Sequence, residues 1–430
     1  MTLIVTSQFE LNRVVAPRLP SAPIQYDKQF HDQHSDVLRL YFNRLDSILG
    51  QLVASMETIP VSIGGTNVDA FNRLRVSNPL TLFDSSHRYA DNNLWANSIT
   101  GTAAATFSAN EGLVNLTVGS ASGDQIIRET IKVFSYQPGK SLLVMNTFVF
   151  GDPKANLRQR AGYYGAANGI YFERDGSTNY MVERSSVTGS VVNTRVAQAN
   201  WNQDPMDGTG PSGLTLDSSK AQILYMDVEW LGLGTVRTGF IINGVFVPCH
   251  NFDHANLVNT TYITTASLPL RYEMTNTAAT TGASTLKQVC STVISEGGYE
   301  LRGAQLSAGN TITSPTTLTT AGTFYPIVSI RLKTTRLDAI VILTALSILG
   351  ITNNANYKWE VVASGTTTGG TWVSAGTNSA VEYNITGTSF SSTGGRILAT
   401  GFFQGSNQGS NSVDILKEAL FTTQLERDPF

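Results

Sequence analysis

The stretch Asp69-Ala-Phe-Asn-Arg-Leu-Arg-Val-Ser-Asn-Pro-Leu-Thr-Leu-Phe-Asp-Ser-Ser-His-Arg-Tyr89 divides the chain into two parts with different hydrophobic patterns. Before it, apolar residues recur every three or four positions, as on one side of a helix. After it, short runs of β-branched and aromatic residues alternate with turn residues, which is typical of antiparallel strands. We therefore expect a helical N-terminal part that this joint segment connects to a much longer β-rich part.

The arginine and phenylalanine residues of the joint have two interpretations. Arg73 and Arg75 alternate with apolar residues, which in an ordinary globular protein indicates an edge strand with solvated charges. Alternatively, their guanidinium groups bind carboxylates of a neighbouring subunit with the two-pronged geometry that arginine favours. In that case Phe71 and Phe83 belong to the same subunit interface. The two interpretations fit the sequence equally well.

The residues before the joint predict an extended arm followed by one amphipathic helix. Three prolines between residues 17 and 23 disfavour a helix or a central strand over residues 1–26. From Asp27 to about Met56, apolar and aromatic residues recur at intervals of four and three. The attachment interface predicted on this helix consists of Leu38, Tyr41, Leu45, Ile48 and Leu52. Because further apolar residues widen the stripe, a trimeric bundle or docking on another protein fits better than a two-stranded coiled coil, and packing on the chain's own sheet is the alternative.

After the joint, β-strand patterns dominate the sequence. Asp175-Gly176 and Asn243-Gly244 each separate two strand-like runs, and such pairs form the tight turns of β-hairpins. The fold class that we predict is mainly β, with one antiparallel β-sandwich of the jelly-roll or lectin-like kind and a second, smaller β-domain. The predicted parts are the arm and helix (1–60), the joint (61–87), the sandwich (88–305), a small polar linker (306–323) and the second β-domain (324–430).

The composition limits the classes of partner. Charged residues make up 14% of the chain, against roughly 25% in typical globular domains, which indicates an uncharged polar surface. The formal net charge is -3 and no cluster of lysine and arginine is present, so nucleic acid is not an expected partner. The most apolar run, Ala339–Gly350, is too short to span a bilayer, and residues 1–7 lack the features of a signal peptide. We expect a protein that is made in a cytoplasm and is not inserted into a membrane.

Two polar clusters could bind metal ions, and for both we favour a structural role. In Cys249-His-Asn-Phe-Asp-His254, a tetrahedral site would need three or four ligands to converge, whereas successive strand residues point to opposite faces. Asp204 and Asp207 could hold Ca²⁺ through their oxygens, but turns in which an aspartate accepts hydrogen bonds from the backbone explain the same residues. We therefore predict no metal and no cofactor.

The sequence does not favour enzymatic activity. Glycoside hydrolysis needs two carboxylates across a cleft, and Glu173, Glu183, Asp227 and Glu229 lie on strands where they could meet. However, acidic residues on strands most often point to solvent, and no hydrolase, nucleotide-binding or metalloprotease motif is present in a supporting context. Trp372 and Tyr383 could form an aromatic platform for sugars, although core packing explains them more simply.

Four segments resemble virion structural proteins of tailed bacteriophages, in particular those of marine phages. They are Leu19-Pro-Ser-Ala-Pro-Ile-Gln-Tyr-Asp27 with Leu38-Arg-Leu-Tyr-Phe-Asn-Arg-Leu-Asp46, the joint, residues 204–216, and Trp230-Leu-Gly-Leu-Gly-Thr-Val-Arg-Thr-Gly-Phe240. The joint differs from the associated pattern Phe-Gly-Arg-Leu-Arg-Val-Ser by having Asn72 in place of glycine.

The resemblance implies a structural protein of the virion. We expect a non-enzymatic homotrimer whose N-terminal arm and helix attach it to other virion proteins of the tail, the portal region or the capsid. Its β-domains would project outward as part of a fibre, a spike or another tail-associated structure. The alternatives are a protein that decorates or cements the head, and a receptor module that binds or cleaves glycans of the host surface.

Overall fold

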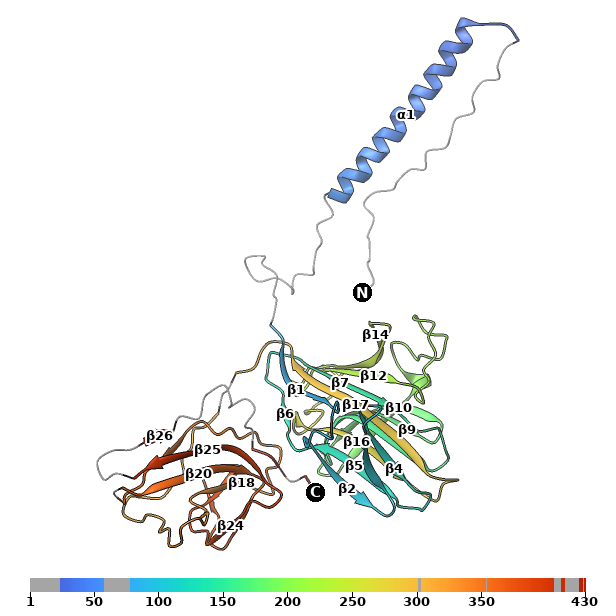
Figure 1. Cartoon of the computed structure of the whole chain (residues 1–430). Helices are drawn as coiled ribbons and strands as arrows, with labels where there is room; N and C mark the ends of the chain where they lie inside the picture. The colour runs from blue at the N-terminus through green and yellow to red at the C-terminus, as the bar shows by residue number, and fades with distance from the viewer. Residues whose placement is uncertain are drawn as a thin grey trace. The chain divides into compact units, whose positions relative to one another are not determined.

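The computed structural model describes residues 24–57, 78–300, 303–352, 354–405, 411–413, 425–427 and 429–430. The chain forms two compact units, Met1–Val76 and Ser77–Phe430. The first contains the helix α1 and the second contains the strands, all of which pair in antiparallel fashion (Figure 1). The predicted fold class, a single helix followed by antiparallel β-sheets, is confirmed. Residues 1–23 of the predicted arm lie outside the described residues.

Helix α1 spans Lys28–Glu57 and begins where the sequence predicts. The Asp27 side chain accepts a hydrogen bond from the backbone N–H of Gln29 at 2.8 Å, which satisfies one of the unpaired donors at the start of a helix. The predicted stripe residues Leu38, Tyr41, Leu45 and Ile48 are half-buried, and the side chain of Leu52 lies outside the described residues. None of the α1 side chains that the structure describes belongs to either buried hydrophobic cluster of the chain.

Two large sheets form the sandwich. The eight-stranded sheet has the order β14-β13-β12-β7-β17-β4-β3, with β1 also paired to β17, and the seven-stranded sheet has the order β11-β10-β9-β8-β16-β5-β2. The strands of the first sheet are β1 (Leu80–Ser86), β3 (Ala104–Ser108), β4 (Leu113–Val118), β7 (Leu142–Val149), β12 (Gln222–Val228), β13 (Val236–Ile242), β14 (Val245–Phe252) and β17 (Ser284–Ser295). Those of the second are β2 (Trp95–Thr100), β5 (Gln125–Thr130), β8 (Leu157–Tyr164), β9 (Gly169–Asp175), β10 (Thr178–Ser185), β11 (Val192–Ala197) and β16 (Leu270–Asn276). A short pair, β6 (Phe134–Ser135) with β15 (Ser267–Leu268), and the 3-10 turn Gln198–Asn200 complete this region.

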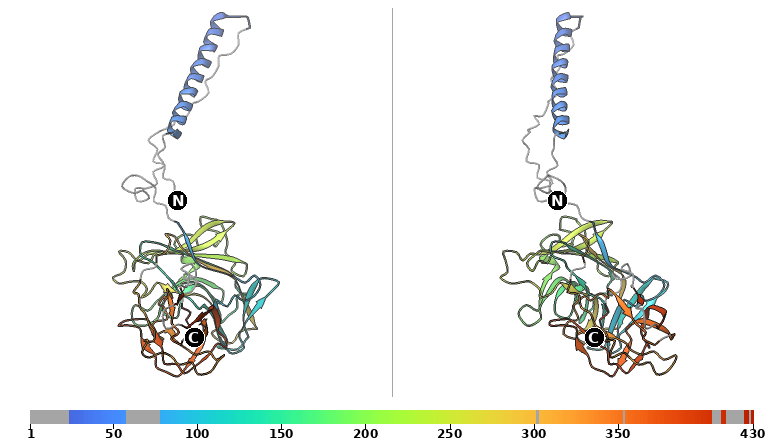
Figure 2. Two further views of the ribbon diagram at one scale, coloured as in Figure 1. Left: turned by 60° about the vertical axis from the view of Figure 1, so that its left-hand side comes forward. Right: turned by 90° about the vertical axis from the view of Figure 1, so that its left-hand side faces the viewer.

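The hydrophobic core lies between the two large sheets. Phe172 of β9 packs on Phe150, which follows β7, with ring centroids 5.5 Å apart, and on Phe240 of β13 at 5.2 Å. These rings come from opposite sheets, so their contacts hold the two layers face to face. Figure 2 shows the same strands from two further directions. The predicted hairpins are present: Asp175-Gly176 joins β9 to β10, and Asn243 and Gly244, with φ values of 52° and 80°, join β13 to β14.

The second half of the opening stretch is part of the eight-stranded sheet. Strand β1 covers Leu80–Ser86 and pairs with β17, so the sheet includes residues that the sequence analysis assigned to the joint. Alternate side chains explain this, because Phe83, Ser85 and His87 are buried. The first half of the joint, residues 69–77, lies outside the described residues.

Small two- and three-stranded sheets make up the C-terminal region. The strands are β18 (Ser329–Leu332), β19 (Leu346–Ile348), β20 (Asn356–Ala363), β21 (Thr366–Thr368), β22 (Val373–Ser374), β23 (Val381–Asn384), β24 (Ser389–Ser391), β25 (Arg396–Gln404) and β26 (Asn411–Val413). The described residues between Ser295 and Ser329 contain no strand, and this interval includes the predicted linker. The exact domain boundaries stay predictions.

Candidate functional site

Five charged side chains form a continuous row on the seven-stranded sheet, on the face opposite the core. We call them the ionic layer: Glu129, Arg160, Glu173, Arg271 and Glu273. Their position follows from strand alternation. Phe172 precedes Glu173, and Tyr272 lies between Arg271 and Glu273; because both rings belong to the core, the charged side chains beside them point to the other face of the sheet. Register places Arg160 directly opposite Glu173 on one neighbouring strand and Glu273 on the other, and Arg271 opposite Glu129. Arg160 with Glu173, Arg160 with Glu273 and Arg271 with Glu129 are therefore cross-strand pairs, whereas Arg271 and Glu273 pair along the same strand, β16.

The distances show an alternating chain of carboxylates and guanidinium groups. Arg160 places Nε 2.6 Å from Oε2 of Glu173 and Nη1 2.9 Å from Oε1 of Glu273. Arg271 places Nη1 3.0 Å from Oε2 of Glu129 and Nη2 3.1 Å from Oε2 of Glu273. Glu273 is thus shared between two arginines. Such charge-assisted bonds are among the strongest that side chains make.

The ionic layer is almost completely withdrawn from solvent. Glu173 is 0% exposed, Glu273 is 3% exposed and Arg160 is 6% exposed. Tyrosine rings lie against the guanidinium groups: Arg160 is 5.3 Å from the Tyr171 ring centroid, and Arg271 is 5.3 Å from that of Tyr164. Burial of this many charges is costly unless each is paired, and the row pairs every carboxylate.

Electrostatics fix the protonation state at the centre of the row. Burial alone would raise the pKa of Glu273, but the charges of Arg160 and Arg271 outweigh it and lower the pKa below the usual value. Burial raises the pKa of the Tyr164 hydroxyl well above its usual value. Glu273 is therefore an anion at neutral pH, whereas a general acid needs a carboxyl group with a raised pKa. The geometry suits a rigid ionic bridge across four strands.

Further arginines lie at both ends of the ionic layer. Arg195 of β11 pairs with Glu173 at 2.5 Å and with Asp175 at 2.8 Å. At the other end, Arg427 near the C-terminus pairs with Glu129. Its backbone N–H also donates to the carbonyl of Ile131 at 3.0 Å. The ionic layer therefore contacts the last residues of the chain.

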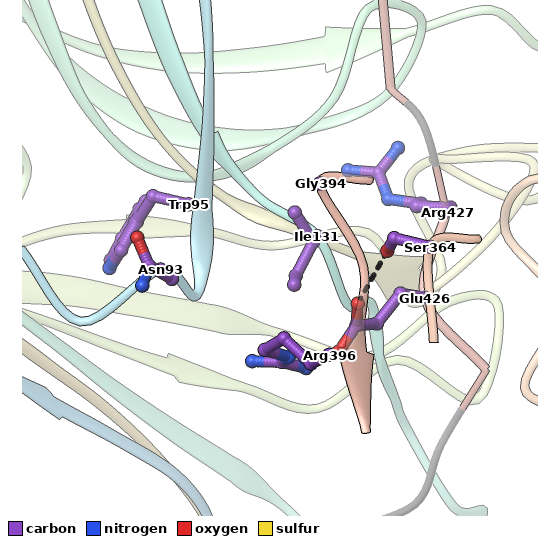
Figure 3. A pocket seen from close by; sticks show the side chains of 8 residues that line it. All are labelled: Asn93, Trp95, Ile131, Ser364, Gly394, Arg396, Glu426 and Arg427. Atoms are coloured by element: carbon purple, nitrogen blue, oxygen red, sulfur yellow. Dashed lines mark hydrogen bonds and ion pairs between the residues drawn. The ribbon is translucent and has the colours of Figure 1, made fainter. Parts of the chain in front are cut away.

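A pocket of about 390 Å³ opens beside Arg427 (Figure 3). It is lined by Asn93, Trp95, Ile131, Ser364, Gly394, Arg396, Glu426 and Arg427. Glu426 accepts a hydrogen bond from the Ser364 hydroxyl at 3.2 Å and pairs with Arg396. Because the charged groups of this pocket are already paired, an ionic ligand would have to displace an existing partner.

The predicted Cys249–His254 cluster does not converge on one point. Cys249 is buried, with its sulfur 3.3 Å from the sulfur of Met206, and His250 accepts a hydrogen bond from the backbone N–H of Asn202 at 3.3 Å. His254 instead lies against Glu183, at 2.7 Å. Within the described ranges, no group of three or more histidine, cysteine, aspartate or glutamate residues is arranged to hold a metal ion.

The Asp204 loop has the turn structure that we favoured. One carboxylate oxygen of Asp204 accepts the backbone N–H of Met206 and the other accepts that of Ser212, both at 2.8 Å. Asp207 accepts the backbone N–H of Thr209 at 2.9 Å. The aspartate oxygens therefore satisfy backbone donors of the loop.

The four carboxylates considered for glycoside hydrolysis have different surroundings. Glu173 belongs to the ionic layer and Glu183 pairs with His254. Asp227 pairs with Arg237, and its pKa is raised mainly by burial, while Glu229 is exposed. Asp227 and Glu229 are near enough for the charge of Glu229 to contribute to the raised pKa of Asp227, whereas Glu173 and Glu183 have other charged partners.

The remaining predicted site residues are placed as follows. Phe83 is 7% exposed and packs in this chain's own core, with its ring centroid 4.9 Å from Phe134, so its burial requires no second subunit. Phe71, Arg73 and Arg75 lie outside the described residues, and the interface roles of all four stay predictions. In the C-terminal region, the guanidinium group of Arg331 covers the Trp372 ring at 4.1 Å. Tyr383 lies on β23, where it pairs with Ile330 and Val373.

Sequence reasoning missed the ionic layer. Its signal was charged residues at alternate positions of aromatic strands, such as Tyr171 and Glu173 on β9.

The described part of the chain contains no helix long and apolar enough to cross a membrane.

No protein-family model matches the chain, and no curated protein matches it. Among solved structures, a GH16 protein of a Bacteroides ovatus mixed-linkage glucan locus is 10% identical, with 49% of this chain and 99% of that chain covered and a TM-score of 0.34. A carbohydrate esterase from the Shiga toxin-encoding bacteriophage phi24B is 13% identical, with 51% and 100% covered and a TM-score of 0.32. The CBM2 module of the evolved Dit of Lactobacillus casei BL23 phage J-1 is 5% identical, with 53% and 100% covered and a TM-score of 0.33. At such values we draw no functional conclusion from the three similarities.

Proposed function

We propose that this chain is a non-enzymatic structural protein of a tailed-phage virion that assembles as a homotrimer through α1. The trimer attaches by its N-terminal arm and helix to other virion proteins and presents the β-structure outward, as a fibre, spike or other tail-associated component. It is made in the host cytoplasm and incorporated into the particle. A head-decorating protein is the alternative position in the virion.

The apolar surface of α1 carries this proposal. Leu40 is 58% exposed, Phe42 is 59% exposed and Leu49 is 50% exposed, and these residues flank the half-buried stripe from Leu38 to Ile48. A 30-residue helix with so wide an apolar surface gains stability when it packs against other helices. Burial of a leucine or phenylalanine side chain contributes about 1.5–3 kcal/mol, so a few such residues per chain support stable association.

The oligomer test compares one stripe variant with a matched control. Leu45→Asp places a charge in the stripe, whereas Asn43→Asp places the same charge at an exposed polar position two residues away, on nearly the opposite side of the helix. By light scattering we expect three times the 46.3 kDa chain mass for the unchanged protein and for Asn43→Asp, and dissociation for Leu45→Asp. A monomeric unchanged protein would refute the homotrimer.

The attachment test uses particles. Phage that carry a chain without residues 1–60 should lose this protein from purified virions, and retention of the truncated chain would contradict attachment through the arm and helix. Replacing Arg73 and Arg75 with Ala should loosen assembly while the β-units stay folded, because arginine–carboxylate contacts between subunits would be lost. If assembly is unchanged, the joint is only a linker.

Glycan binding or cleavage at the host surface is the second candidate function. The pocket lined by Trp95, Asn93 and Arg396 is the observation that favours a sugar ligand, since such sites combine an aromatic ring with a few polar groups. Binding of the full chain to a glycan array, lost in Arg396→Ala, would support this function. If the chain binds no glycan, the glycan-related function is refuted and only the structural role remains.

A further inference from the structure

The C-terminal β-region has almost no hydrophobic core of its own. In the described part of the chain, all buried apolar side chains except one lie between Phe83 and Val293. The exception is Leu332, which is 6% exposed. A region of some eighty residues normally buries well over half of the surface that its unfolded chain exposes. Residues 324–405 therefore lack the burial that stabilises the sandwich of the same chain.

Large apolar side chains of this region are exposed instead. They are Phe324, Ile327, Val328, Leu349, Ile351, Val373, Ile397, Leu398 and Phe402. Phe402 is 78% exposed and Ile397 is 57% exposed. Together these side chains expose roughly 700–800 Å² of apolar surface, which is close to what one partner contributes to a protein interface of standard size.

In the strand pair β20–β25, one face is packed and the other lacks apolar contacts. On one face Tyr357 stacks on Phe403 with ring centroids 5.0 Å apart, and the Trp359 ring packs so closely over Gly401 that a Cβ there would lie 2.7 Å from the indole nitrogen. The opposite face, which we call the open face, carries Phe402 and, past the register shift at Leu398, Ile397. An isolated two-stranded sheet is only marginally stable in water, so burial of its second face would supply the stability that this pair lacks.

Charges do not oppose the packing of this region against another copy of itself. Arg331 pairs with Glu382 at 3.0 Å, Lys358 pairs with Glu360 at 2.6 Å, and Arg396 pairs with Glu426. Lys358, the register partner of Phe402, is thereby neutralised beside the open face. Two identical copies would meet through apolar and paired groups, without the like-charge repulsion that usually keeps equal surfaces apart.

We propose that the C-terminal β-region completes its hydrophobic core between copies of this chain, with the open face of β20–β25 packed against neighbouring copies. A region that cannot bury its apolar side chains alone needs a partner from the time of synthesis. A second copy is always present at a fixed ratio, and closed homo-oligomers are the commonest assemblies of single chains. The inference rests on the proposed homotrimer for the number of copies.

Hydrogen exchange of the full-length chain, followed by mass spectrometry together with light scattering, tests this inference. In the oligomer we expect the amides of β20 and β25 to be protected, and Phe402→Lys to reduce their protection at least tenfold. The matched control is Phe246→Lys, because Phe246 is 49% exposed on β14 of the sandwich. That variant should leave β20 and β25 unchanged.

The outcomes separate this inference from the proposed function. A trimer in which Phe402→Lys leaves the β20 and β25 protection unchanged overturns the shared core while the α1 homotrimer stands. A monomer with protected β20 and β25 means that the chain covers the open face itself, and both proposals fall. Protection that appears only in intact particles assigns the face to another virion protein and overturns the inference.

Discussion

The imidazole of His254 stacks on the ring of Tyr262 with centroids 3.9 Å apart and planes 5° apart. Its two nitrogens are held at the same time, Nδ1 at 2.6 Å from the Gly234 carbonyl and Nε2 at 2.7 Å from a Glu183 oxygen. The ring therefore joins β10 to the turn between β12 and β13 and to the segment after β14. Because one of its partners is a carboxylate, the strength of this connection depends on the charge of the ring.

His254 should make the fold less stable as the pH rises above its ordinary pKa of 6.5. Burial lowers its pKa, but the hydrogen bonds to Glu183 and Gly234 and the charge of Glu183 outweigh burial and raise it above 6.5. The stabilisation is complete below the unfolded-state pKa and is lost as the pH rises through the folded-state pKa. In urea unfolding between pH 6 and 9, His254→Gln should flatten this decline. An unchanged pH profile would contradict the charged pair.

His87 should have the opposite effect in acid. Its ring is buried, neither nitrogen has a hydrogen-bond partner, and burial followed by the charge of Arg128 lowers its pKa from 6.5 to about 4. The unfolded chain takes up the proton first, so stability falls as the pH decreases from about 6.5 to about 4, by about 3 kcal/mol in total. His87→Leu should remove this loss in unfolding titrations at pH 4–7 and keep stability at pH 7. If the stability of His87→Leu still falls in acid, groups other than His87 cause the loss.

Removal of Arg160 should be strongly destabilising. Arg160→Met leaves Glu173 and Glu273 each without one charged partner in a buried position, which typically costs about 3–5 kcal/mol. Arg160→Lys should recover only part of this, because a single ammonium group cannot fork between two carboxylates. The control is Lys220→Met, whose partner Asp217 is 51% exposed and whose loss should cost within about 1 kcal/mol. Equal effects in denaturant unfolding would contradict the buried ionic layer.

The Asp204 loop should be insensitive to calcium. Asp204→Ala removes the acceptor of two backbone N–H groups and should destabilise the chain by about 2 kcal/mol in thermal or denaturant unfolding. Millimolar calcium or a chelator should leave the melting temperature of the unchanged protein where it is. If calcium raises the melting temperature and Asp204→Ala abolishes this increase, the loop is instead a metal site.

Local features were predictable from the sequence, and long-range ones were not. The start of α1 at Asp27 and the Asn243-Gly244 hairpin depend on neighbouring residues, so their patterns were sufficient. The ionic layer joins Arg160 to Glu273, which lie 113 residues apart, and only strand order and register bring them together. Asp204 could be interpreted correctly because its partners lie within the same loop. The burial of Phe83 was missed because it depends on pairing with β17.

Strand β1 also sets the order of events during synthesis. The Thr292 hydroxyl donates to the Phe83 carbonyl across 209 residues of chain, so β1 has no partner until β17 has been made. At ribosomal rates of roughly 5–20 residues per second, that interval lasts on the order of 10–40 s. The helix α1 emerges first and is free to meet other nascent chains while the eight-stranded sheet is still open. If α1 forms the proposed homotrimer, neighbouring ribosomes on one messenger RNA could therefore begin to pair their products before any of them has closed its sandwich.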